Sequence, residues 1–301
     1  MHTGILFWIG FHVVVFLLLA VDLFVLHRKE RAISVKEAAV SSAVWVALSL
    51  AFAGYIHTVE GPAKGVEFLA GYVIEYSLSA DNLFLFIMIF AYFEVPARYQ
   101  HRVLVWGILG ALAMRGAMIG LGVELVRRFE WILYGFGVFL VLTGLRMFAR
   151  SKEPAPGENP VIRLCRKMPR VTPDFHGRNF LAWTAAGWML TPLALVLVAI
   201  DVMDVIFAVD SIPAVFAVTT DPFIVYTSNV CAIVGLRSLY FLLAGVAGRF
   251  KHLHYGLAAV LTFIGAKMLL AGVVHIGAAV SLAVVAALLG VAVIWSLVGE
   301  G

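Results

Sequence analysis

Long apolar runs, nine in all, constrain the fold more than any other feature of this sequence. About 20 helical residues cross the hydrocarbon core of a bilayer, where lipid offers the backbone no hydrogen-bond partner, so such runs fold as transmembrane helices. The chain is 62% hydrophobic and 13% charged, and a soluble domain cannot bury that much apolar surface. We therefore expect an all-α polytopic membrane protein, with residues 1–301 in a single transmembrane domain.

The expected spans follow one another closely, apart from one polar segment. They cover approximately residues 4–26, 38–58, 66–92, 103–125, 130–149, 190–218, 223–247, 255–274 and 278–298. The first run lacks a basic leader and an A-x-A cleavage site, so we expect a retained span rather than a signal peptide. The polar segment covers residues 150–189. Its FLAWTAAGW stretch, residues 180–188, is too short to span and is expected to lie at the interface or to form a hairpin.

Basic residues concentrate in alternate loops. Of the 22 Lys and Arg residues, 15 fall in the odd-numbered loops and three in the even-numbered loops. The positive-inside rule places the basic loops in the cytosol, which predicts an outside N-terminus, a cytoplasmic C-terminus and a cytoplasmic 150–189 loop. The pI near 9.1 therefore reflects topology and does not indicate nucleic-acid binding. Cys165 and Cys231 form no CxxC motif and indicate neither a disulfide framework nor a metal knuckle.

A short acidic motif occurs twice within the apolar runs. VIEYSLSADN at 73–82 aligns with VMDVIFAVDS at 202–211, and the similarity continues into the two following spans. The matched pairs are Glu75 with Asp204, Asp81 with Asp210, Arg115 with Arg237, and Arg146 with Lys267. Each unit holds an odd number of spans, so its two copies must lie in opposite orientations. This predicts inverted repeats over 66–149 and 190–274, an arrangement of many secondary transporters, with a substrate site near the midplane.

Carboxylates interrupt the third and sixth expected spans. They are Glu75, Asp81, Asp201, Asp204 and Asp210. Each charge at a helix centre costs about 2.5–3.5 kcal/mol, so these acids need partners. One interpretation is that they pair structurally with Arg115, Arg237 and Lys267. Because the acids outnumber these bases, we favour a cation site in which the bases act as counter-ions or gates.

The spacing of the acids limits how they share an ion. Six residues turn an ideal helix by about 600°, which points Glu75 and Asp81 about 120° apart. Either the helices break at the midplane, or each acid pairs with an acid of the other repeat. Pro213 and the poor helix formers in both motifs favour broken helices, whose freed carbonyls would add ligands.

The candidate ligands are almost entirely oxygen atoms. Asn82, Ser79 and Ser211 are further candidates beside the carboxylates, and neither motif contains His or Cys. Hard oxygen ligands suit Mg²⁺, Ca²⁺ or Mn²⁺ rather than Zn²⁺ or Cu²⁺. Met203 offers a thioether that would favour Mn²⁺, although such a residue more often only packs.

At these motifs the chain resembles the TerC/Alx family of bacterial membrane proteins. The resemblance runs over nearly the full length and includes EYSLSADNLFLF, LGALAMRG, TPLALVLVAIDVMDVIFAVDSIPAVFA and the GLRSLYF region. It implies export of Mn²⁺ across the cytoplasmic membrane by a transporter with three-plus-three inverted repeats, although the older family label refers to tellurium resistance. It also implies that the five acids carry the metal. Asp201 departs from the pattern, because relatives more often have Glu there.

Other functions are open alternatives. One is transport of Ca²⁺ or another substrate such as an amino acid. A second is a membrane scaffold that supports redox or tellurite resistance, with structural acids. The absence of HExxH, GxSxG and a nucleotide-binding loop argues against an enzyme and an ATP-driven pump. We expect no prosthetic group, with Mn²⁺ as the transported ion, the bilayer as surroundings, no nucleic-acid partner and no identified protein partner.

Overall fold

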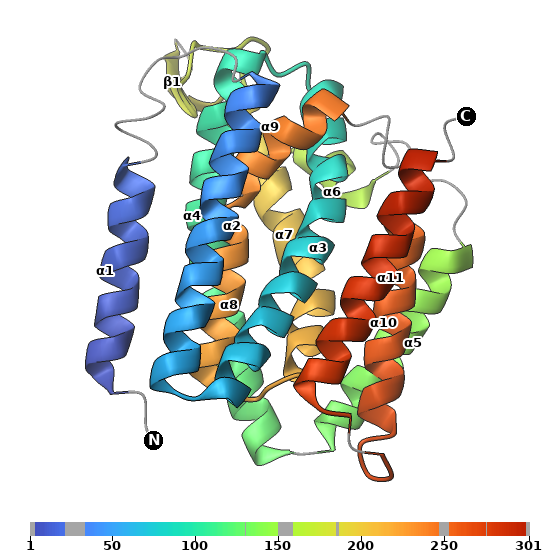
Figure 1. Ribbon diagram of the computed structural model, residues 1–301. Helices are drawn as coiled ribbons and strands as arrows, with labels where there is room; N and C mark the ends of the chain where they lie inside the picture. Colours follow the sequence, from blue (N-terminus) through green and yellow to red (C-terminus); the bar gives the residue numbers. More distant parts are fainter. Residues whose placement is uncertain are drawn as a thin grey trace.

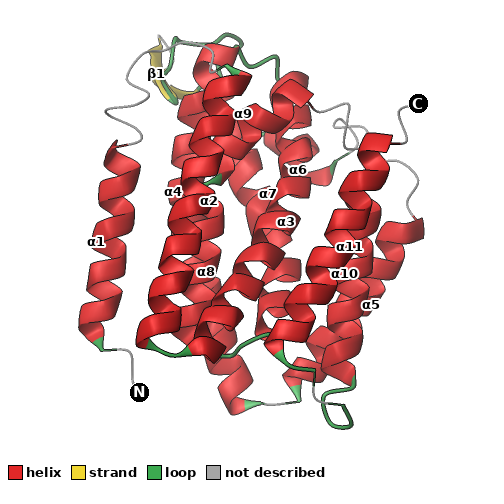
Figure 2. Cartoon of the chain, viewed as in Figure 1, coloured by secondary structure: helices red, strands yellow, loops and turns green. Residues whose placement is uncertain are grey.

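The computed structural model is an all-α membrane bundle, as expected (Figure 1; Figure 2). It describes residues 4–21, 34–129, 131–149, 159–184, 187–246, 253–274 and 276–298. The helices are α1 (Ile5–Val21), α2 (Val35–Val59), α3 (Pro62–Tyr92), α4 (Ala97–Arg128), α5 (Ile132–Ala149), α6 (Pro160–Arg166), α7 (Pro192–Phe216), α8 (Pro222–Val234), α9 (Leu236–Val246), α10 (Leu253–Leu269) and α11 (Ala278–Val298). The strands are β1 (Leu181–Thr184) and β2 (Gly187–Leu190).

Each expected span corresponds to a helix or to the α8–α9 pair. Among the described residues, six helices are long and apolar enough to cross a membrane, and the bent α8–α9 pair makes a seventh. Helices α1 and α10 are apolar but have 17 residues each. In Figure 1, α1 begins and α11 ends at opposite ends of the bundle, which agrees with an odd number of crossings.

Local sequence signals explain several helix starts. Proline occupies the first turn of α3, α7 and α8, where its missing N–H costs nothing. Ser34 and Glu37 form a capping box at the start of α2, and the Asp221 carboxylate accepts from two backbone N–H groups of α8. The loop segment expected to be interfacial or hairpin-like is a hairpin, because β1 and β2 pair antiparallel. The short helix α6 in the same loop was not predicted.

Helices α3 and α7 lie in the middle of the bundle and run in opposite directions (Figure 1). Helix α3 packs against α2, α7, α8, α9 and α11, and α7 packs against α3, α4 and α5. Helix α1 lies at one side, whereas α5, α10 and α11 group at the other. Among the acids of the third and sixth expected spans, Glu75 and Asp204 are buried in the bundle interior, with 0% and 5% of their surface exposed.

The contacts across the α5–α10 interface are symmetric about two glycines that the sequence alignment matches. A Cβ at Gly144 would lie 2.7 Å from the Ala258 carbonyl oxygen and 2.3 Å from Thr262, whereas one at Gly265 would lie 2.6 Å from the Gly137 carbonyl oxygen and 2.8 Å from Val141. In the sequence alignment Gly144 matches Gly265, and their contacts match as well. Glycine lets the two backbones approach closely where lipid supplies no hydrophobic driving force.

The prediction of broken helices at the midplane is wrong. Both α3 and α7 are continuous, and Ser77 satisfies its hydroxyl by donating to the Val73 carbonyl of its own helix at 2.6 Å. An unwound segment in apolar surroundings would leave its backbone N–H and C=O groups without hydrogen-bond partners. The helical conformation is therefore kept despite residues of low helix propensity. Pro213 lies inside α7 and has no N–H to donate to the Val209 carbonyl, yet the helix continues past it to Phe216. A bend of 42° does occur, between α8 and α9 at Gly235.

Candidate cation site

Arg115, in the middle of α4, connects the acids of the two repeats. Its guanidinium donates to Asp204 of α7 from Nε at 2.9 Å and from Nη2 at 2.8 Å. Nη1 pairs with Glu75 Oε1 of α3 and donates to Ser211 Oγ at 3.4 Å. Arg115 itself is 2% exposed, so this triad of one base and two acids is buried. The sequence predicts that Arg115 pairs with the acids or acts as their counter-ion, and in the structure it contacts Glu75 and Asp204.

Helical periodicity determines which polar groups join the triad. Ser79 follows Glu75 by four residues and donates to Glu75 Oε1 at 3.0 Å. Ser211 follows Asp204 by seven residues, which is two turns, and so lies on the same face of α7. Because both helices are continuous, each acid of the first position meets its counterpart from the other repeat across Arg115. For this one pair of acids the structure has the second arrangement that the spacing allowed, with Arg115 between the two carboxylates.

The charges within the triad do not balance. Arginine stays protonated in proteins and carries one positive charge, whereas the two ionised carboxylates carry two negative charges. The triad then has a net charge of minus one. Burying an uncompensated charge costs several kcal/mol. The triad therefore favours one additional positive charge, either a proton or a cation.

Two buried carboxylate oxygen atoms have no hydrogen-bond partner in the described part of the chain. They are Glu75 Oε2 and Asp201 Oδ1. The Asp201 carboxylate lies against α4, where a Cβ added to Gly110 would be 3.0 Å from Oδ1 and 3.1 Å from Oδ2. Glycine at this position leaves room for the acid. Orphaned buried acceptors are rare in folded proteins, and they are the atoms that a bound cation satisfies.

The second acid of each motif points elsewhere. Asp210 has the Thr143 hydroxyl of α5 as its polar neighbour rather than Arg115. Asp81 and Asn82 are half-buried on α3. Asp81 lies about 120° around the helix axis from Glu75. Within the described ranges, no group of three or more His, Cys, Asp and Glu side chains is arranged to hold a metal ion. The five-acid metal site is therefore not assembled in this conformation.

Arg237 and Lys267 are the other two bases proposed as counter-ions or gates. Arg237 is 2% exposed at the start of α9, next to the bend, and its Nη1 donates to His101 Nε2 of α4 at 2.7 Å. Lys267 is half-buried in the last turn of α10. Met203 packs in the core, and Asn159 Nδ2 lies 3.9 Å from its sulfur, which gives the thioether a structural partner.

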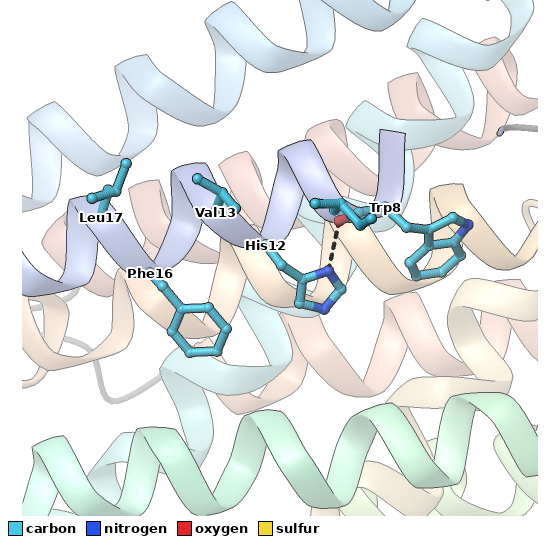
Figure 3. Close-up of a pocket in the computed structure, with 6 residues that line it drawn as sticks. Trp8, His12, Val13, Phe16 and Leu17 are labelled. Carbon is cyan, nitrogen blue, oxygen red and sulfur yellow. Dashed lines mark hydrogen bonds between the residues drawn. The ribbon is translucent and has the colours of Figure 1, made fainter. Parts of the chain in front are cut away.

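Helix α1 carries a groove of about 530 Å³ that is separate from the triad (Figure 3). Trp8, His12 and Phe16 line it together with apolar neighbours on the same helix. His12 Nδ1 lies 2.8 Å from the Trp8 carbonyl, so this nitrogen carries the proton, and the Tyr226 hydroxyl donates to Nε2 at 2.9 Å. The bond to Tyr226 attaches α1 to α8, whereas the bond to Trp8 stays within α1, and together they indicate a packing role for His12.

Sequence reasoning missed Asn229 and Gly110. Asn229 on α8 is 1% exposed, and both of its amide atoms lack hydrogen-bond partners in the described part of the chain. One available signal was an amide within an apolar run, eight residues before Arg237. Gly110 gave no signal of its own, because many glycines occupy these spans.

Comparison with known proteins agrees with the architecture. The sequence model described as "Integral membrane protein TerC family" matches residues 60–300. An uncharacterized membrane protein of Myxococcus xanthus, STKORF319, is 48% identical over 292 residues, covering 97% of this chain and 92% of that protein. The protein named "Putative membrane-bound redox modulator Alx" of Escherichia coli K12 is 50% identical over 290 residues, covering 93% and 90%.

An uncharacterized membrane protein of Rickettsia bellii is 38% identical over 283 residues, covering 94% of each chain. No solved structure matches the chain. The family match contains α3, α4 and α7, the three helices that carry the triad. The chain belongs to the TerC family of integral membrane proteins.

Proposed function

We propose that this protein is a secondary transporter that exports a divalent metal ion, Mn²⁺ in the first instance, across the bacterial cytoplasmic membrane. The observation that carries the proposal is the buried Arg115 triad. One acid from each repeat is held at the bundle centre, with negative charge in excess and with Glu75 Oε2 and Asp201 Oδ1 unpartnered. A purely structural ion pair would need one acid for Arg115, whereas this site has Glu75 and Asp204 and, on the same helix as Asp204, Asp201.

In this proposal Arg115 neutralises the site between transport events. A divalent cation entering the site displaces the guanidinium from Glu75 and Asp204 and takes up carboxylate oxygens, with Ser79 and Ser211 hydroxyls beside them. These hard oxygen donors suit Mn²⁺, Mg²⁺ or Ca²⁺ better than Zn²⁺ or Cu²⁺. The choice of Mn²⁺ among them rests on the family resemblance. Asp81 and Asp210 join the path as secondary ligands in other conformations.

Outward movement of a divalent cation needs an energy source. Against a membrane potential of 100 mV it costs about 4.6 kcal/mol, and the sequence has no nucleotide-binding loop. Proton antiport is the simplest coupling, because the carboxylates released by the metal can bind protons in its place. The proposed orientation has the N-terminus outside and the C-terminus in the cytosol.

A membrane scaffold with structural acids is the second candidate. The pairing of Arg115 with Glu75 and Asp204 favours it, since this interpretation predicts such pairs. A thiol-based redox role has less support. Cys165 is 2% exposed, and burial raises the pKa of its thiol, whereas reactive cysteines have a lowered pKa and an accessible sulfur.

Uptake of Mn²⁺ into inside-out membrane vesicles tests the proposal. Vesicles that contain the protein should accumulate Mn²⁺ above the level of control vesicles when a proton gradient is imposed. Ca²⁺ and Mg²⁺ should compete more effectively than Zn²⁺ if oxygen ligands determine selectivity. Uptake equal to that of control vesicles for every metal would reject transport and leave the scaffold.

A further inference from the structure

Asn229 is a buried polar residue that the Arg115 triad does not use. It is 1% exposed, and neither amide atom has a hydrogen-bond partner in the described part of the chain. Its neighbours on α8 differ, because Thr227 Oγ1 donates to the Phe223 carbonyl at 2.7 Å and Ser228 Oγ to the Val225 carbonyl at 3.2 Å. Buried amides in native structures are almost always bonded, so one without partners indicates a group that acts in another state.

Two contacts fix the orientation of α8. A Cβ at Gly71 of α3 would lie 2.8 Å from Ser228 Oγ, and one at Gly116 of α4 would lie 3.3 Å from the Tyr226 ring. At about 100° per residue, Asn229 lies about 100° from Ser228 and about 60° from Tyr226, within the sector between them. Its side chain therefore points into the space between α3 and α4.

The same space holds the triad. Glu75 follows Gly71 by one turn of α3 and points toward α4, where it meets Arg115. Arg115 directly precedes Gly116, which faces α8. Glu75 Oε2 is unpartnered as well. Glu75 Oε2 and the Asn229 amide, both buried and without partners in the described part of the chain, thus face one region formed by α3, α4 and α8.

We propose that Asn229 is a ligand of the central cation site, giving its amide oxygen to a divalent cation that Glu75 also binds once Arg115 has moved away. The inference rests on the transport function proposed above and specifies its ligand set. An amide oxygen is a hard, neutral donor that raises the coordination number without adding negative charge. The cation then has ligands from α3, α7 and α8.

The test compares melting temperatures of the purified full-length protein in detergent, with and without Mn²⁺. Asn229→Leu removes both polar atoms with little change of volume. It should leave the metal-free melting temperature equal or higher, and it should weaken the Mn²⁺-dependent stabilisation at least tenfold in Mn²⁺ concentration. Asn229→Asp keeps an oxygen donor and should retain the stabilisation.

Thr227→Val is the matched control, because Thr227 is equally buried on α8 and its hydroxyl is bonded within the helix. It should retain the full Mn²⁺ response. If Asn229→Leu fails to fold, Asn229→Ser provides the same comparison, since its shorter side chain no longer reaches the ion. An Mn²⁺ response in Asn229→Leu or Asn229→Ser equal to that of the wild type overturns the inference alone. A wild-type protein with neither an Mn²⁺ response nor Mn²⁺ flux overturns the proposed function and, with it, this ligand role.

Discussion

Replacing Arg115 by Gln should destabilise the metal-free protein, and Mn²⁺ should restore much of the loss. The guanidinium makes two bonds to Asp204, at 2.9 and 2.8 Å, and also pairs with Glu75, and the three side chains are at most 7% exposed. Removing one partner of a buried ion pair costs about 3–5 kcal/mol. Two carboxylates lose the same partner here, so the upper half of that range applies. At roughly 2 °C per kcal/mol for a large domain, the melting temperature should fall by about 8–10 °C.

The assay is thermal unfolding of the purified protein in detergent, followed by tryptophan fluorescence. A cation that replaces the guanidinium and is present at 100 times its dissociation constant stabilises by about 2.7 kcal/mol, which is about 5 °C. Arg146→Gln is the matched control, since Arg146 is exposed in the last turn of α5 and should shift the melting temperature by at most about 1 °C. An unstable Arg115→Gln protein that Mn²⁺ does not rescue would refute the exchange of guanidinium for metal.

Three further substitutions test separate parts of the account. Asp210→Asn should abolish Mn²⁺ export in cells without lowering the melting temperature; a loss of stability with intact export would assign Asp210 a structural role. Gly110→Ala should press on the Asp201 carboxylate and slow Mn²⁺ flux while stability changes by less than about 1 kcal/mol, because alanine favours the helix; unchanged flux would place Asp201 outside the site. Gly144→Val should destabilise the protein by about 2–4 kcal/mol in chemical or thermal unfolding, whereas Gly135→Val, on the open side of α5, should not. Equal effects of the two substitutions would contradict the close α5–α10 packing.

Much of the fold followed from simple physical signals in the sequence. Apolar run length predicted the membrane class and the positions of the helices. The FLAWTAAGW stretch is too short to cross a bilayer, so it was expected to lie at the interface or to form a hairpin, and it forms a hairpin. The internal repeat also indicated that Glu75 and Asp204 belong together. A mid-span base needs a carboxylate, which made Arg115, Arg237 and Lys267 candidates to pair with the acids, and the sequence did not distinguish Arg115 from the other two.

The backbone at the site was harder to predict. Poor helix formers and Pro213 suggested broken helices, but tertiary packing in an apolar environment kept α3 and α7 continuous. The bend lies at Gly235 instead, and the sequence does not distinguish this glycine from the many others in the apolar runs. Which of the acids face Arg115 depends on helix rotation, which packing against neighbours sets. Asn229 was missed for the same reason, since its significance depends on the helices around it.

Mn²⁺ flux into proteoliposomes containing only the purified protein tests the central claim most directly. A metal-sensitive dye inside the liposomes should report Mn²⁺ entry through the wild-type protein under an imposed proton gradient. The nearly isosteric Asp204→Asn variant removes one negative charge from the triad, and with it the electrostatic compensation that a dehydrated divalent ion needs. Its flux should fall to that of protein-free liposomes. Wild-type flux no greater than in protein-free liposomes, or equal flux through Asp204→Asn, would contradict the account.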